Sequence, residues 1–164
     1  SNTHKVPQAK VLRTAVASGI YTTTQGLSID MFGLSAKLGQ QENQKIEVKA
    51  LTDSTISLHF PAYDVPLVGD FPYSNAAQKE YQLDKVVVKF QPDGTMSFAS
   101  KVKIETVFQM TPAKMKKDDI PYRTFPDTPI SYEGTIKGKE LTVKITAQPG
   151  KMPFPVTYNY VGQK

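Results

Sequence analysis

Few side chains in this 164-residue sequence could support histidine-dependent catalysis. The only histidines are His4, in a polar N-terminal stretch, and His59, which shares the polar phase of a predicted strand with Thr55 and Ser57. A Ser-His-Asp relay or a histidine-based metal site would need one of them. The alternation around His59 predicts a strand residue that faces solvent, so neither histidine is predicted to be catalytic and no metal is expected.

Two pairs of carboxylates are the other candidates for chemistry. Asp64 and Asp70 lie in "FPAYDVPLVGDFP", and Asp118 and Asp119 lie in a proline-rich stretch directly after several lysines. Glycosidases use two carboxyl groups at a defined separation. A carboxylate-dependent glycan hydrolase is therefore an alternative, although charge balance with the lysines also explains the second pair. No D-x-D-x-D-G spacing indicates a calcium loop.

The composition excludes other classes of site. There are no cysteines, so disulfides, thiolate zinc sites and a cysteine nucleophile are excluded for this sequence. It contains no P-loop and no dinucleotide-binding fingerprint, so we expect no cofactor. The net charge is +5, but only Arg13 and Arg123 are arginines among twenty basic residues. Nucleic-acid sites draw heavily on arginine, so no nucleic-acid partner is expected.

The elements that must position these residues are strands. In "DKVVVKFQPDGTMSFASKVKIETVFQM", apolar residues alternate with lysines on both sides of a "QPDG" turn, which predicts a hairpin. Similar alternation recurs through the chain, and we count eight or nine strands. Strands joined by tight turns predict an all-β fold, an antiparallel up-and-down barrel or a sandwich.

Three segments need separate predictions. The stretch Pro112 to Pro129 holds four prolines and predicts a long irregular loop. "GIYTTTQGLSIDMFGL" predicts two strands hinged at Gln25-Gly26. "AYDVPLVGDFP" predicts a connection that closes one end of the barrel through four apolar side chains, Val65, Leu67, Val68 and Phe71.

Aromatic and methionine side chains gather on the predicted inner face. They form either an ordinary packed core or the wall of a cavity for an apolar or amphipathic ligand, because a barrel of about eight strands can be filled or can hold one small ligand. The candidate ligand-binding residues are Phe60, Met96, Phe98, Tyr132, Tyr158 and Tyr160.

With the strands placed, the chain resembles the calycin-like (lipocalin-like) β-barrel domains of exported Bacteroidetes lipoproteins. The residues that carry the resemblance are "TISLHF", "VGDF", "YQLDKVVVKFQPDGTMSF" and the C-terminal "YEGTIKGKELTVKITAQPGKMPFPVTYNYVGQK". The resemblance implies an up-and-down barrel of about eight strands, in one domain over residues 18–164 after a tail or linker at 1–17. It also implies export to the cell envelope or beyond, and no assigned chemistry.

The function we expect is therefore that of an exported, non-enzymatic barrel. It would bind a small apolar or amphipathic ligand or serve as an interaction module of the cell envelope, and a surface module with a filled barrel is a further alternative. Contact with a membrane is expected only through a lipid anchor on an upstream segment, since the sequence given has no cysteine to lipidate. The sequence does not indicate an oligomeric state.

Overall fold

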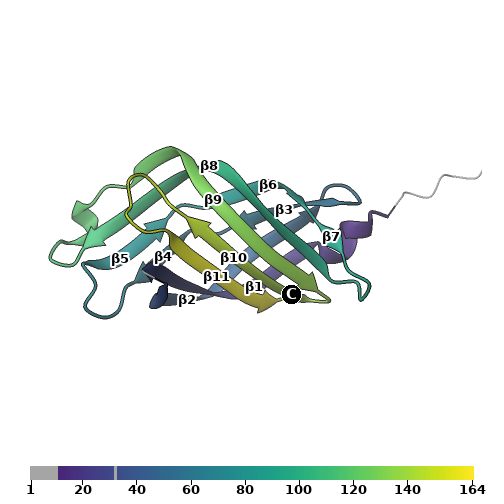
Figure 1. Ribbon diagram of the computed structural model, residues 1–164, viewed down its shortest axis with the longest axis horizontal. Coiled ribbons are helices and arrows are strands. Elements are labelled where there is room, and N and C mark those ends of the chain that lie inside the picture. Colours follow the sequence, from purple (N-terminus) through teal and green to yellow (C-terminus); the bar gives the residue numbers. More distant parts are fainter. Residues whose placement is uncertain (1–10, 32) are drawn as a thin grey trace, which may run out of the picture.

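The computed structural model describes residues 11–31 and 33–164, and these form one curled antiparallel sheet (Figure 1). Its eleven strands, in chain order, are β1 (Gly19–Met31), β2 (Leu34–Ala50), β3 (Thr55–Phe60), β4 (Tyr63–Pro66), β5 (Tyr73–Gln78), β6 (Tyr81–Val87), β7 (Lys89–Phe90), β8 (Met96–Pro112), β9 (Arg123–Lys137), β10 (Glu140–Ala147) and β11 (Val156–Gln163). Two short 3₁₀ helices, η1 (Arg13–Ala17) and η2 (Lys117–Asp119), complete the described elements.

This architecture confirms the predicted all-β, antiparallel barrel. The strand order is β4-β5-β8-β9-β10-β11-β1-β2-β3-β6, with β7 paired to β8 beside this path. The count exceeds eight or nine because no strand was predicted at β4 or β5, and one predicted strand is divided into β6 and β7. On one side β8 pairs with β7 at its start and with β5 at its end, and β2 pairs with β3 only over its last four residues, so short strands complete the curved wall.

The core lies on the inner face of the sheet, at every second residue of the strands. In β10, Leu141, Val143 and Ile145 are fully buried, whereas Thr142 and Lys144 are exposed. The lysines predicted to lie on the polar phase are all exposed, namely Lys85, Lys89, Lys101, Lys103 and Lys144. Apolar area removed from water at about 25 cal/mol per Å² is the main stabilising contribution of such a face.

The helix η1 covers one end of the barrel. Thr14 and Ala17 are fully buried, and the Thr14 hydroxyl donates to the carbonyl oxygen of Thr52 at 2.5 Å. The guanidinium carbon of Arg13 lies 3.9 Å from the centre of the Phe90 ring. At the same end the Lys164 Nζ donates to the carbonyl oxygens of Val16 and Ser18. The predicted boundary between residues 17 and 18 stays a prediction, since residues 1–10, with His4, lie outside the described residues.

The prediction of an irregular loop from Pro112 to Pro129 is wrong for its second half. β9 begins at Arg123 and includes Pro126 and Pro129. β10 pairs with β9 only from Ile130 onward, so the first part of β9 has one side without a ladder partner. A proline that donates no hydrogen bond is tolerated at such an edge.

The predicted hinge at Gln25-Gly26 is also wrong. β1 runs without a break, because its pairing with β11 is continuous from Thr22 to Ile29. The irregularity lies in the pairing with β2, whose register shifts on both sides of Gly26, and Asn43 in β2 has a φ of 57°.

The predicted packing of the connection after β3 is confirmed in part. It contains the short strand β4, and Val65 is fully buried while Leu67 and Phe71 are half-buried, as expected. Val68 is not part of this packing, because its side chain is 60% exposed. Its backbone makes the contact instead, since the Val68 N–H donates to the carbonyl oxygen of Leu38 in β2 at 2.7 Å.

The predicted "QPDG" hairpin turn is confirmed. The Gly94 N–H donates to the carbonyl oxygen of Gln91 at 2.9 Å, and the Asp93 carboxylate accepts from the Thr95 N–H at 3.0 Å. Gly94 has a φ of +87°, which glycine adopts at little cost. The turn thus fixes the register of β7 on β8.

Replacing Phe98 tests the inner face of β8. Phe98 is 4% exposed, and its ring lies against Gly134, where an added Cβ would be 2.6 Å from the Phe98 Cζ. We expect Phe98→Ala to lower the free energy of unfolding by ~3–5 kcal/mol, because a packed ring leaves a cavity. Lys101→Ala, on the outer face of the same strand, should change it by less than ~0.5 kcal/mol. Urea unfolding of both variants measures this, and equal losses would contradict the assigned faces.

Candidate ligand site

An apolar hollow lies at the end of the barrel opposite η1. It has a volume of about 510 Å³. Its strand-borne wall includes Ile29 of β1, Phe108 and Met110 of β8, and Phe125 of β9. The rest of the lining comes from further positions of β5, β8 and β9, from Phe71 before β5, and from two loops, residues 113–122 and 148–155, which lie at the same end in Figure 1. We call this hollow the mouth cavity. Its size and lining are those of a site for a small molecule.

Strand register explains why apolar side chains meet here. Phe125 lies opposite Thr106, and Arg123 lies opposite Phe108, so both β9 residues share the inner face of the β8 residues that they oppose. On the other side, Ile29 lies opposite Val156 of β11. These residues end their strands at the same rim. The inner faces of β1, β8 and β9 therefore continue into the mouth cavity.

The 148–155 loop packs on this rim through Gly150. Gly150 has a φ of +61°, and a Cβ at this position would lie 2.6 Å from the Phe125 ring. Only glycine allows this approach without displacement of the ring. Met152, Phe154 and Lys151 are thereby brought to the lining of the mouth cavity.

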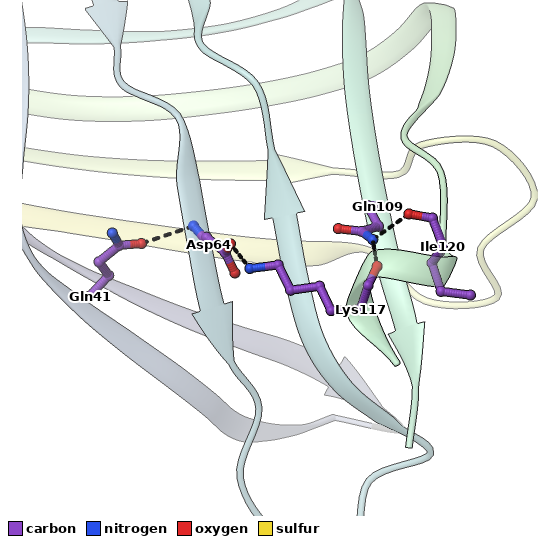
Figure 2. Close-up of polar contacts among 5 residues, drawn as sticks. All are labelled: Gln41, Asp64, Gln109, Lys117 and Ile120. Carbon is purple, nitrogen blue, oxygen red and sulfur yellow. Dashed lines mark hydrogen bonds and ion pairs between the residues drawn. The ribbon is translucent and has the colours of Figure 1, made fainter. Parts of the chain in front are cut away.

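The second loop, residues 113–122, forms a strap held by polar contacts (Figure 2). The side-chain amide of Gln109 donates to two strap carbonyl oxygens, those of Lys117 at 2.9 Å and Ile120 at 2.6 Å. The Lys117 ammonium forms an ion pair with Asp64 of β4. The Asp64 backbone N–H donates to the Gln41 side chain at 3.0 Å. Ile120 and Pro121 of the strap face the mouth cavity as a result.

These contacts give one predicted carboxylate a structural position. Asp64 binds the strap, and an exposed pair of this kind contributes about 0–1 kcal/mol. Asp70, Asp118 and Asp119 are exposed and do not line the mouth cavity. His59 is half-buried at the surface, with its Nε2 3.2 Å from a carboxylate oxygen of Glu80. Within residues 11–31 and 33–164, no group of three or more metal-binding side chains is gathered.

The six candidate ligand-binding residues lie in the packed interior and not at the mouth cavity. Three of them form one region, in which Phe60 lies 5.1 Å from the Tyr160 ring and Tyr158 projects from the same strand, β11. A second region holds Phe98 and Tyr132, with ring centres 6.3 Å apart. Met96 is buried opposite Ile136. Their role in ligand binding stays a prediction.

Tyrosine hydroxyls are paired inside this apolar interior. The Tyr63 hydroxyl donates to the Tyr158 hydroxyl at 2.7 Å, and the Tyr158 hydroxyl donates to Gln78 Oε1 at 3.1 Å. The hydroxyls of Tyr81 and Tyr160 are 3.1 Å apart. We call these four tyrosines the tyrosine network. Paired hydroxyls allow large aromatic rings to fill the barrel without an unsatisfied polar group at each ring.

Burial changes the acidity of these phenols. It raises the pKa of Tyr63, Tyr81, Tyr158 and Tyr160 well above the usual value of 10, because the phenolate would lose its hydration. Burial also raises the pKa of Tyr21 to about 12. The tyrosine network is therefore neutral and hydrogen-bonded throughout the physiological range.

Sequence patterns did not single out most of the mouth cavity. Phe108 and Met110 were expected on the inner face, because they continue the alternation of β8. Four other lining residues were not predicted, because they lie in or beside proline-rich stretches without alternating hydrophobicity. These are Arg123, Phe125, Met152 and Phe154. A cluster of prolines flanked by aromatics on both loops was the one available signal.

Comparison with known proteins identifies the fold family. The model of the family described as "Calycin-like beta-barrel domain" matches residues 17–163. A crystal structure of a "putative outer membrane protein" from Bacteroides fragilis is similar, with a TM-score of 0.63 and 18% sequence identity. The similarity covers 95% of this chain and 54% of that chain, so this chain spans about half the length of its structural neighbour. No curated protein matches. No helix among the described residues is long and apolar enough to cross a membrane.

Replacing Tyr158 tests the tyrosine network. Tyr158→Phe would leave the Tyr63 hydroxyl and Gln78 Oε1 without their partner in a buried position, and each such group costs about 1–3 kcal/mol. We expect the free energy of unfolding to fall by about 2 kcal/mol or more in urea titrations. Tyr122→Phe, on a ring that is 37% exposed, should change it by less than ~0.5 kcal/mol. Equal stability of the two variants would mean that the hydroxyl pairing does not stabilise the barrel.

The same network predicts loss of stability at alkaline pH. Its stabilising contribution is complete below pH 10, where tyrosines of the unfolded chain are also protonated. Above pH 10 the unfolded chain releases protons that the folded barrel retains, at about 1.4 kcal/mol per group and pH unit. Unfolding measured between pH 8 and 11 should therefore show a decline that is shallower in Tyr158→Phe. An identical slope in both proteins would contradict this origin.

Proposed function

Because the chain belongs to the calycin-like β-barrel domain family, we propose that it is a non-enzymatic binding protein that takes a small apolar or amphipathic ligand in the mouth cavity. The observation that carries the proposal is the construction of the barrel. One end is covered by η1 and the interior is packed, whereas the other end holds a hollow of about 510 Å³ with an apolar lining. Buried apolar contact with such a hollow supports binding of a molecule with a hydrocarbon part.

The position of the cavity modifies the function expected from the sequence. The candidate residues in the middle of the barrel would bind a ligand only if their packing opened. The mouth cavity needs no such change, because Phe108, Met110 and Phe125 already border it. We therefore assign the ligand to the rim and treat the tyrosine network as part of the packed interior.

The cell envelope is the location that we propose. The support is the similarity to a Bacteroides fragilis structure described as an outer membrane protein, together with the family match. A barrel at the envelope that holds an amphipathic molecule is consistent with both. The alternative of a carboxylate-dependent glycan hydrolase has no comparable support, because Asp64 pairs with Lys117 and the other candidate carboxylates lie outside the mouth cavity.

A neutral fluorescent dye tests the proposed function. We expect N-phenyl-1-naphthylamine to increase in fluorescence with the protein, because the apolar wall excludes water. Met110→Trp places a larger side chain in the mouth cavity and should weaken dye binding about tenfold or more. Val161→Trp, at a position 56% exposed on β11, is the matched control and should leave binding unchanged. Absence of dye binding, or equal effects of both variants, would favour a filled structural module.

A further inference from the structure

Two cations border the mouth cavity, and its lining contains no carboxylate. Arg123 and Lys151 are the charged residues of the lining, and both are exposed at the rim. Within the part of the chain that the structure describes, neither side chain takes part in an ion pair. The lining of the cavity therefore carries a positive charge that none of its own residues neutralises.

A bulge in β9 directs Arg123 to the inner face of the sheet. Ile104 of β8 lies opposite Thr128, whereas Thr106, two residues further on, lies opposite Phe125. β9 therefore contains one extra residue between these pairs, and such a bulge reverses the faces of the residues beyond it. Thr128 and Phe125 both lie on the inner face as a result, and so does Arg123, two residues before Phe125. Regular alternation from Thr128 would have placed Arg123 on the outer face.

The 148–155 loop brings the second cation to the same part of the rim. Gly150 packs on the Phe125 ring, where an added Cβ would lie 2.6 Å from the ring. Phe125 and Arg123 lie two residues apart on one face of β9, which corresponds to about 7 Å along a strand. Lys151 follows Gly150 directly in the chain and also lines the cavity. Both cations are therefore grouped around Phe125.

The two kinds of surface at the rim favour a ligand with two different ends. The apolar wall, with Phe108, Met110 and Phe125, favours a hydrocarbon chain. Charges of one sign at a concave, apolar surface concentrate the electric field and attract the opposite charge. The guanidinium of Arg123 offers a planar pair of N–H donors that suits the oxygens of a carboxylate or a phosphate, and Lys151 adds a point charge. A cationic head would be repelled by both residues.

From these observations we propose that the ligand is an amphipathic anion, with one hydrocarbon chain and one carboxylate or phosphate head. The chain lies against the apolar wall, and the head binds Arg123 and Lys151 at the rim, where it keeps contact with water. This exposed position suits a charged head, since a buried charge is costly unless it is fully paired. The inference rests on the proposed function, because it names the class of molecule that the mouth cavity takes.

Ligands with the same chain and different heads test the sign of the charge. Displacement of the neutral dye is measured at pH 8 with dodecanoate, dodecyl phosphate, the neutral dodecyldimethylamine oxide and the cation dodecyltrimethylammonium, all below the concentrations at which they form micelles. We expect both anions to bind about tenfold or more tightly than the amine oxide, and the cation to bind more weakly than the amine oxide. The preference for anions should decrease in about 1 M sodium chloride, where exposed charges are screened beyond about 3 Å.

Variants test the two cations independently of the ligand series. Arg123→Gln should weaken the binding of both anions about tenfold and leave the affinity for the amine oxide unchanged, and Lys151→Gln should act in the same direction. Lys139→Gln, which removes the same charge in the turn between β9 and β10, is the control and should have little effect. Circular dichroism and melting temperature establish that each variant is folded.

The outcomes distinguish this inference from the function on which it rests. Tighter binding of an anion that is lost in Arg123→Gln supports the inference, and the tighter of the two anions identifies the head. If the dye binds but the anions and the amine oxide compete equally, or if Arg123→Gln matches Lys139→Gln, the assignment of an anion is wrong and the cavity function stands. If neither the dye nor any of the four compounds binds, the proposed function fails as well.

Discussion

The interior of this barrel depends on hydrogen bonds between phenols. Wide aromatic rings reach across the space between opposite walls, and their hydroxyls must then find partners far from water. The contacts of Tyr63 with Tyr158 and of Tyr81 with Tyr160 join β4 and β6, at the two ends of the strand order, to β11 near its middle. These contacts hold both ends of the strand order against the middle of the sheet.

Much of the fold could be predicted because its information is local. Alternation in β8 and β10, and glycines such as Gly94 with positive φ, follow from two-residue periodicity and turn chemistry. The inclusion of Pro126 and Pro129 in a strand could not be predicted, because it depends on one side of this part of β9 having no strand partner. That is a property of the assembled sheet.

The candidate site was less predictable for a related reason. A period identifies a face, and the inward positions of Phe98, Tyr132, Tyr158 and Tyr160 were predicted correctly, whereas Tyr63 and Tyr81 were not predicted there. The alternation does not show where along the barrel the packed interior ends and a hollow begins. The hollow lies at the rim, where Phe108 and Phe125 line it. One of the loops around it is positioned by a single contact, that of Gly150 with Phe125. The spacing of these residues in the sequence does not predict that the loop contacts the rim.

The pairing of the first long strand with the last has a consequence for how the chain reaches this state. β1 lies between β2 and β11, so one of its sides stays open until residues 156–163 are available. The entropy of closing a loop over most of the chain is lost before the β1–β11 contacts can stabilise the fold. We therefore expect the barrel to be completed late in folding, and folding to be slow for a chain of this size. The Lys164 ammonium, which donates to the carbonyl oxygens of Val16 and Ser18, then joins the C-terminal residue to the segment around η1. A partly synthesised copy would expose β1 as an unpaired edge, and such edges can pair with other chains.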